Sequence, residues 1–221
     1  MRPHWDHAFA SGGVYQEPDN WSKLLDPVFR VGERLYGQYS MRRIWAAWKK
    51  AALLEPGVRL GGNARLINKH TRDAARIGEN TVCRGIIRVE RGAHVDIGKE
   101  VYLGDEAIVS AMESVTIGRG TLIAHGVQIF DNTSHPIDWR GRERHFKRIL
   151  GQPVDGSIEI PTAPVTIGEH CWLGFGSAVL KGVTIGDRSI VAAGCVVTKD
   201  VPPDTLVVSS MATFIDLNKQ G

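Results

Sequence analysis

The chain has 221 residues, which is enough for one sizeable domain and a smaller appendage. Its 27 Lys and Arg residues against 24 Asp and Glu give a formal net charge of +3, too small an excess to indicate binding of nucleic acid. No apolar run approaches the roughly 20 residues of a membrane span, and the first residues lack the apolar core of a signal peptide. We therefore expect a soluble cytoplasmic protein with no nucleic-acid partner.

Residues 1–57 are predicted to form a helical N-terminal segment. Apolar residues recur at helical spacing from about 21 to 35 and again from about 41 to 54, where Trp45 and Trp48 lie on one side. Glu55-Pro56-Gly57 ends the second helix. We expect the apolar side to cover one end of the following domain, because a stack of repeats needs a cap. The alternative is a basic, Trp-bearing helix in peripheral contact with a membrane, which would bring the protein to the inner face of that membrane.

A six-residue repeat begins near Leu60 and dominates the rest of the chain. Each unit has an aliphatic residue, then usually Gly, Ala, Asp or Glu, then two polar or small residues and a small or β-branched one, as in Ile97-Gly98-Lys99-Glu100-Val101. Eight-residue steps occur at 89–97 and 109–117. The repeat ends at Pro202-Pro203, since two successive prolines cannot donate to a sheet ladder. After one interruption the aliphatic positions resume in phase at Ile167, Leu173, Val179, Ile185, Val191 and Val197.

A repeat of this length gives very short strands joined by tight corners. Three units close one triangular coil of about 18 residues, and stacked coils form three parallel sheets around a dry core. Without the interruption, residues 60–200 supply about six coils. The expected fold class is an all-β solenoid, with 1–57 as the helical segment, 58–204 as the β-helical domain and 205–221 as a tail. Three cysteines fall at inward positions and are expected to be small core residues in a reducing compartment: Cys83, Cys171 and Cys195.

The repeat is interrupted at 131–164 by a segment rich in Arg, Pro and Gly. Long insertions between strict repeats form loops, and such loops often carry function. This one contains His135 followed by Pro136. Histidine suits a general base because its ordinary pKa of about 6.5 lies near working pH. Asp131 and Asp138 bracket His135, and each either orients the second ring nitrogen of His135 or caps the loop.

Three segments carry a family resemblance: Thr133-Ser134-His135-Pro136-Ile137-Asp138, residues 165–174 with Trp172-Leu173-Gly174, and residues 193–203. The chain from about 60 to 204 resembles the hexapeptide-repeat acyltransferases, and within them the sugar and polysaccharide O-acetyltransferases, which include galactoside and maltose acetyltransferases. The resemblance implies a left-handed parallel β-helix and a homotrimer with active sites between subunits. It also implies that acetyl-CoA lies in the groove between adjacent β-helices, with the catalytic histidine, here His135, on the loop that leaves the helix.

The resemblance also assigns residues to the cofactor groove. Trp172 matches the family's tryptophan there, and we expect it in an outward corner of the repeat, in contact with a ligand or a neighbouring subunit. Ala193, Thr198 and Lys199 match positions that contact acetyl-CoA in related enzymes, and Lys199 can meet a phosphate as a point charge. The segment after Pro203 departs from the family, because it lacks the basic residues that normally meet the CoA phosphates. No metal is expected.

The implied reaction is transfer of an acetyl group from acetyl-CoA to a sugar hydroxyl. The acceptor-side Asn and Asp of the small-sugar enzymes have no clear counterpart in residues 104–114. This difference argues against a simple galactoside or maltose acceptor, and the resemblance implies instead a sugar in a cell-surface polysaccharide (O-antigen, capsule or exopolysaccharide) or its precursor. Two alternatives stay open: a streptogramin-type antibiotic acetyltransferase, which shares the loop histidine and the Trp-x-Gly segment, and a non-catalytic trimeric scaffold. A γ-type carbonic anhydrase is excluded, because it needs two zinc-binding histidines five residues apart and no His pair here has that spacing.

Overall fold

The computed structural model describes residues 37–209, so the predicted helix at about 21–35 and the end of the chain from residue 210 lie outside the described residues. The chain divides into two compact units, 1–39 and 40–221, and the second contains every strand described below. Residues 37–51 are helical, and two further helical elements lie at Arg72–Ala74 (η1) and Trp139–Ile149 (α2). Of the helices in the described range, none is both long and apolar enough to cross a membrane.

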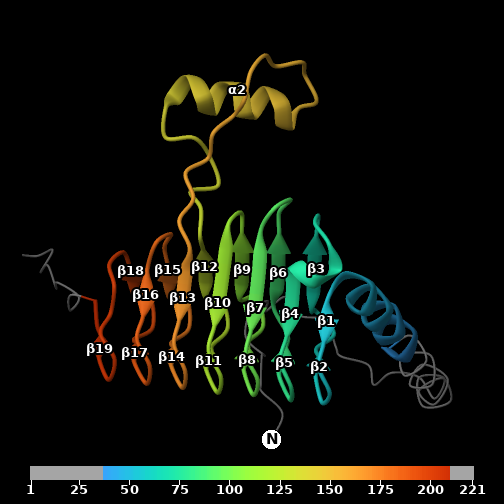
Figure 1. Cartoon of the computed structure of the whole chain (residues 1–221), viewed down its shortest axis with the longest axis vertical. Helices are drawn as coiled ribbons and strands as arrows, with labels where there is room; N and C mark the ends of the chain where they lie inside the picture. Colours follow the sequence, from blue (N-terminus) through green and yellow to red (C-terminus); the bar gives the residue numbers. More distant parts are fainter. Residues whose placement is uncertain (1–36, 210–221) are drawn as a thin grey trace, which may run out of the picture. The chain divides into compact units, whose positions relative to one another are not determined.

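Parallel strands stack into three sheets, which we call A, B and C (Figure 1). Successive strands enter A, then B, then C, so three strands make one coil. The described strands form six complete coils, and β19 (Leu206–Val207) belongs to a partial seventh, so the array continues beyond Pro202-Pro203, where it was expected to end. This is the left-handed parallel β-helix that was predicted. Sheet A contains β1 (Leu53–Leu54), β4 (Ala75–Ile77), β7 (His94–Ile97), β10 (Ser114–Ile117), β13 (Val165–Ile167) and β16 (Thr184–Ile185). Sheet B contains β2 (Arg59–Leu60), β5 (Val82–Cys83), β8 (Tyr102–Leu103), β11 (Leu122–Ile123), β14 (Trp172–Leu173), β17 (Ile190–Val191) and β19 (Leu206–Val207). Sheet C contains β3 (Arg65–Asn68), β6 (Ile86–Val89), β9 (Ile108–Ala111), β12 (Gln128–Phe130), β15 (Ala178–Val179) and β18 (Val196–Val197).

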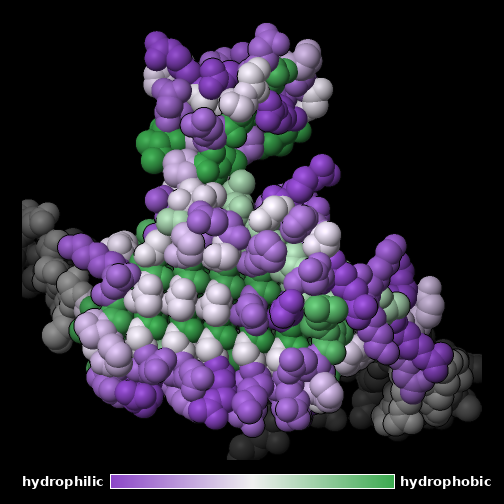
Figure 2. All heavy atoms as spheres, viewed as in Figure 1, coloured by the Kyte–Doolittle hydropathy of each residue, from purple (hydrophilic) through white to green (hydrophobic). Residues whose placement is uncertain are grey.

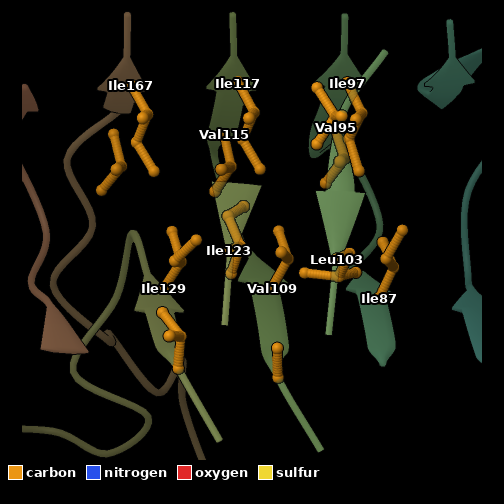
Figure 3. Close-up of a cluster of buried hydrophobic side chains, with 14 of the residues drawn as sticks. Ile87, Val95, Ile97, Leu103, Val109, Val115, Ile117, Ile123, Ile129 and Ile167 are labelled. Carbon is orange, nitrogen blue, oxygen red and sulfur yellow. The ribbon is translucent and has the colours of Figure 1, made fainter. Parts of the chain in front are cut away.

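The core is built from the aliphatic position of each repeat. In sheet A, Ile97, Ile117 and Ile167 pair in direct register through successive coils, and each is 1% exposed. Their side chains lie in one row (Figure 3). Figure 2 shows that residues of similar hydropathy form bands that run from coil to coil, because every coil presents the same pattern to its neighbours. The aliphatic positions that resume after the interruption are all buried: Ile167, Leu173, Val179, Ile185, Val191 and Val197.

The small position of the repeat is buried as well, and most of its polar members are hydrogen bonded, the Ser177 hydroxyl being the exception among the described residues. Thr121 Oγ1 donates to the Gly168 carbonyl oxygen (2.9 Å) and accepts from Cys171 N (3.1 Å). The three cysteines are free and buried, in agreement with their inward positions. Burial raises the pKa of the Cys83 thiol to about 12 and also raises the pKa of Cys171. These thiols are therefore held in the protonated, unreactive form.

Coils before the insert are longer than coils after it. Ile117 follows its partner Ile97 by 20 residues, whereas Ile185 follows its partner Ile167 by 18. The additional residues lie where the chain passes from sheet C to sheet A, which we call the C–A corner, at the eight-residue steps of the sequence. The insert at 131–164 occupies this same corner in the fourth coil, between β12 and β13. The C–A corner is thus the place where these coils accept additional chain.

The end of the helix that precedes β1 packs against the first coils. Trp48 is 1% exposed and Ala52 is fully buried, and both join the same core as the aliphatic repeat positions. Arg72 Nε, from η1, donates to the Ala52 carbonyl oxygen (3.0 Å). The chain then enters β1, earlier than the expected start of the β-helical domain at residue 58. It does so because the edge of sheet A offers the β1 backbone a hydrogen-bonding partner in β4.

Candidate active site

The insert leaves the β-helix through a short antiparallel neck. Asn132 and Thr162 form an antiparallel bridge across it. Next to this bridge, Ala163 N donates to the Asp131 carbonyl oxygen (2.8 Å). Beyond the neck the insert carries α2 (Figure 1). The neck therefore sets the point from which residues 133–138 emerge.

Asp131 anchors the neck to the end of the third coil. Its side chain is fully buried, and its carboxylate accepts hydrogen bonds from the backbone N–H groups of Met112 (2.8 Å) and Glu113 (2.7 Å). The same carboxylate accepts from Asn132 Nδ2 (2.9 Å). Of the two roles expected for Asp131, these contacts favour capping of the loop, because each of them holds a backbone segment or the neck in place.

Asp138 caps the N-terminus of α2. Its Oδ2 accepts from the backbone N–H of Gly141 (2.8 Å), which satisfies one of the unpaired donors of the first helical turn. Both carboxylates that bracket His135 in the sequence therefore accept hydrogen bonds from backbone N–H groups. In the part of the chain that the structure describes, neither is hydrogen bonded to the imidazole of His135, and their assignment as catalytic residues stays a prediction.

The chain turns sharply just before His135. Ser134 adopts a left-handed φ of 60°, and its N–H donates to Asn132 Oδ1 (2.9 Å). Thr133 holds His135 twice: its carbonyl oxygen accepts from His135 N (2.7 Å), and its hydroxyl donates to the His135 carbonyl oxygen (2.8 Å). The backbone of His135 is thereby fixed, while its side chain is exposed. An exposed imidazole on a fixed backbone suits a group that must meet a substrate in one geometry.

Helix α2 folds back over the segment that follows His135. Gly141 and Pro136 are both buried and lie against one another. The Arg142 guanidinium donates to the carbonyl oxygen of Ile137. Gly141 and His145 are four residues apart and therefore share one side of α2. That side of the helix is the one that faces the His135 segment.

His145 contacts His135 directly. Their Nδ1 atoms are 3.1 Å apart, and the ring centroids are separated by 5.0 Å with an angle of 55° between the planes. Burial lowers the pKa of the half-buried His145, and the nearby His135 and Arg148 lower this pKa further. His145 was not predicted from the sequence; its spacing to Gly141, on a helix capped by Asp138, is the feature that could have revealed it. Among the described residues no group of three or more His, Cys, Asp or Glu side chains is arranged to hold a metal ion.

Trp172 lies within β14 of sheet B rather than in an outward corner, which corrects the expected position. Its side chain is 52% exposed and is in register with Leu122 of β11 and Ile190 of β17. It points outward because the next residue along the strand, Leu173, points into the core. Four strands of sheet B between β8 and β19 thus carry exposed apolar side chains in register, the apolar row of sheet B: Tyr102, Leu122, Trp172 and Leu206.

The other three predicted cofactor residues lie at the two edges of sheet C. Ala193 is in the turn before β18, and Thr198 and Lys199 directly follow that strand; all three are exposed. Lys199 therefore lies at the C–A corner, where the insert with His135 leaves two coils earlier. Ala193 lies at the opposite edge, where the chain passes from sheet B to sheet C. Within one chain, Lys199 therefore lies at the corner from which the insert emerges. Ala193 lies at the edge of sheet C that is next to sheet B, the sheet that carries Trp172.

The corner between sheets B and C also carries an aromatic pair that was not assigned from sequence. The rings of His125 and Phe175 are stacked, with centroids 5.4 Å apart and planes 3° from parallel. Gly194 N, next to Ala193, donates to the Phe175 carbonyl oxygen (2.9 Å). A cavity of about 540 Å³ lies at this corner, lined by Tyr102, Asp105, Glu106, Ala124 and His125. The backbone of the aromatic pair is therefore joined to the turn that contains Ala193.

A second cavity, of about 390 Å³, lies inside the insert next to the His135 segment. Pro136 and Gly141 form part of its wall, and Arg144 and Glu159 contribute charged groups of both signs. A pocket of this size with a few polar groups can hold a small polar ligand.

Comparison with known proteins identifies the family. The family described as "Hexapeptide repeat of succinyl-transferase" matches residues 164–199, in the fifth and sixth coils. Nodulation protein L of Rhizobium meliloti is 36% identical to this chain over 136 residues, which cover 62% of this chain and 67% of that protein. The chain belongs to the hexapeptide-repeat acyltransferase family.

Another curated relative of this chain is galactoside O-acetyltransferase of Escherichia coli, 33% identical over 132 residues, which cover 60% of this chain and 58% of that protein. The chain spans between 52% and 67% of the length of the first curated relatives it matches. Among solved structures, an N-acyltransferase from Bacillus cereus in complex with dTDP and 3-hydroxybutyryl-CoA has a TM-score of 0.56 and 15% identity, covering 72% of this chain and 79% of that one. At this identity the likeness concerns the fold alone.

Proposed function

We propose that the chain is an acetyl-CoA-dependent O-acetyltransferase that moves an acetyl group to a sugar hydroxyl, with His135 as the general base. The observation that carries the proposal is the exposed imidazole of His135, whose backbone is fixed by Thr133 and whose Nδ1 contacts His145. No described residue is hydrogen bonded to the other ring nitrogen, Nε2, so this atom is accessible to a substrate. The similarity to galactoside O-acetyltransferase supports acetyl transfer to a sugar.

The chemistry requires a proton to move twice. Nε2 of His135 takes the proton of the sugar hydroxyl as its oxygen attacks the thioester carbon, and a tetrahedral oxyanion forms. The C–S bond then breaks, and the imidazolium returns the proton to the departing CoA thiolate. Backbone N–H groups are the expected donors to the oxyanion. In this scheme His135 meets the reacting atoms, while Asp131 and Asp138 hold the loop that carries it.

The proposed acetyl-CoA site uses Trp172, Ala193, Thr198 and Lys199. The exposed Trp172 ring and the small Ala193 suit the pantetheine arm, and the Lys199 ammonium suits a phosphate. Within one chain these residues lie on different sides of sheet C, which favours a groove completed by a second subunit. The apolar row of sheet B supports the proposed homotrimer, because exposed apolar rows of this kind mark contact surfaces.

The proposed acceptor is a sugar of a cell-surface polysaccharide or its precursor, and the cavity next to Pro136 offers it room. The proposed location is the cytoplasm, supported by the three free, buried cysteines. Peripheral contact of the N-terminal helices with the inner face of the membrane is part of the proposal. Trp48 is buried against the first coils, so in the described part such contact would use exposed basic side chains such as Lys49 and Lys50.

The test is release of free CoA thiol from acetyl-CoA in the presence of candidate acceptors. The panel contains simple sugars, nucleotide sugars, polysaccharide fragments and a streptogramin. His135→Ala is compared with His94→Ala, an exposed histidine on β7 outside the loop. We expect thiol release with a glycan acceptor that His135→Ala abolishes and His94→Ala leaves unchanged.

The other outcomes separate the alternatives. Faster acetylation of the streptogramin than of any glycan would favour the antibiotic acetyltransferase. A protein that neither binds CoA in calorimetry nor releases thiol with any acceptor would favour the non-catalytic scaffold.

A further inference from the structure

We propose that His145 is a positioning residue, which holds His135 in the tautomer that a general base requires by accepting a hydrogen bond from its Nδ1. The inference rests on the role proposed above for His135. It assigns a purpose to α2, the helix of the insert that carries His145, and explains how His135 is oriented when neither neighbouring carboxylate reaches its ring.

The Nδ1 atoms of the two histidines are in contact. At 3.1 Å the Nδ1 atoms are within hydrogen-bond distance, and such a bond needs one donor and one acceptor. If His135 donates, its proton is on Nδ1, and its Nε2 carries a free lone pair that can take the hydroxyl proton. If His145 donated instead, the proton of neutral His135 would be on Nε2, and His135 could not act as a base there. The reaction therefore requires His145 to be the acceptor.

His145 is suited to remain that acceptor. It must be neutral, since a protonated His145 has no lone pair on Nδ1. Burial lowers the pKa of His145, and the neighbouring His135 and Arg148, the latter from the next turn of α2, lower it further. When His135 takes up a proton during the reaction, its positive charge further disfavours protonation of His145. The Nδ1–H of His135 then becomes a stronger, charge-assisted donor to the same partner.

The surrounding contacts fix the helix relative to the base. Asp138 caps α2, Arg142 donates to the Ile137 carbonyl oxygen, and Gly141 packs on Pro136. These contacts join α2 to the segment that directly follows His135. A histidine one turn beyond Gly141 is thus held at a set distance from the His135 ring. Without α2, the Nδ1 of His135 would face solvent.

The direct test is the tautomer of His135, measured by ¹⁵N chemical shifts of the ring nitrogens in the full chain without substrate. The two histidines are assigned from the single variants. In the unchanged protein we expect His135 to be protonated on Nδ1 with Nε2 free. In His145→Ala we expect a shift toward the Nε2-protonated form. His145→Asn places an amide oxygen near the former Nδ1 and should restore the first tautomer.

The kinetic test follows thiol release with the same variants. We expect His145→Ala to lower kcat by about 10- to 100-fold with the KM for acetyl-CoA unchanged, and His145→Asn to recover most of the loss. Phe146→Ala is the matched control, since Phe146 is the next residue on α2 and is 60% exposed. We expect this control to retain both the tautomer and kcat.

Two results would overturn the inference: a His135 that is protonated on Nε2 in the unchanged protein, or a His145→Ala variant with unaltered tautomer and kcat. Failure of the proposed function has a different signature. In that case no acyl transfer would occur with any acceptor, while the tautomer of His135 would still respond to His145→Ala.

Discussion

Gly141 lies so close to Pro136 that a side chain at residue 141 would meet the proline ring. A Cβ placed on Gly141 would be 2.9 Å from Pro136 Cβ, closer than such atoms normally approach. Gly141 lies inside α2, where glycine is about 1 kcal/mol less favourable than alanine. The glycine is therefore explained by the close approach of α2 to the His135 segment and not by helix formation.

Gly141→Ala should impair activity without loss of the β-helix. Alanine favours α2 but displaces Pro136, and so moves the His135 ring away from its working geometry. We expect kcat/KM to fall about tenfold or more, because small misplacements of catalytic groups are costly. Thermal unfolding of the β-helix should be unchanged. Glu143→Ala, at an exposed position of α2, is the control, and equal activity of the two variants would contradict the prediction.

Asp131→Ala should destabilise the neck. The change removes a fully buried side chain and leaves the backbone N–H groups of Met112 and Glu113 without their acceptor. We expect the free energy of unfolding in urea to fall by about 2–4 kcal/mol and the insert to become sensitive to protease. Asp96→Ala, on the exposed side of β7, is the matched control and should cost less than about 0.5 kcal/mol. An Asp131→Ala protein as stable as this control would contradict the anchoring role.

Ile117→Ala tests the stacked core. Ile117 is 1% exposed and lies between Ile97 and Ile167 in sheet A. Removal of its side chain leaves a cavity, and we expect a loss of about 2–5 kcal/mol in the free energy of unfolding. Leu122→Ala removes an exposed side chain from the neighbouring strand and should cost much less in the isolated chain. Similar losses for the two variants would argue against the assigned inward and outward positions.

Lys199→Ala should weaken binding of acetyl-CoA with little effect on the chemical step. Lys199 is exposed at the C–A corner, on the side from which the insert emerges. If its ammonium meets a phosphate, we expect the dissociation constant of CoA to rise about tenfold, measured by calorimetry at low salt. Lys99→Ala, an exposed lysine in an earlier coil, is the control. Equal affinities in the two variants would remove Lys199 from the cofactor site.

The stability of the insert should fall as the pH is lowered. The pKa of His145 is lowered from its ordinary value of 6.5 by burial, His135 and Arg148. Below about pH 6.5 the unfolded insert therefore binds more protons than the folded one, and stability is lost as pH falls toward the lowered pKa. We expect amide exchange in α2 to accelerate over this range. In His145→Asn that acceleration should be reduced, and an unchanged pH profile would contradict the assignment.

The fold followed from the sequence because its determinants are periodic. Ile167 and Ile185 occupy the same inward position one coil apart, so burial at one position predicts burial at the other. Trp172 shows the limit of this reasoning: its outward direction was predicted, but its place in β14 was not. Strand β1 was likewise not predicted, because it is defined by pairing with β4 and has no repeat motif of its own.

The sequence predicted only those parts of the candidate site that depend on residues adjacent in the chain. His135 and Pro136 were recognised from their neighbours in the chain. Asp131, in contrast, finds its partners at Met112 and Glu113, in the preceding coil, and no local pattern indicates that contact. Contacts of this kind depend on how coils stack at a corner, and the insert replaces the periodic pattern there.

By itself the sequence determined the β-helix, its inward residues and the loop with His135, because a short repeat places equivalent residues in equivalent surroundings. Only the tertiary structure decided what orients the base. His145 is ten residues from His135, and the two rings meet because α2 is capped by Asp138 and packed on Pro136 through Gly141. The meeting of two side chains across a folded loop depends on the path of the backbone between them, which residue types and spacing alone do not define.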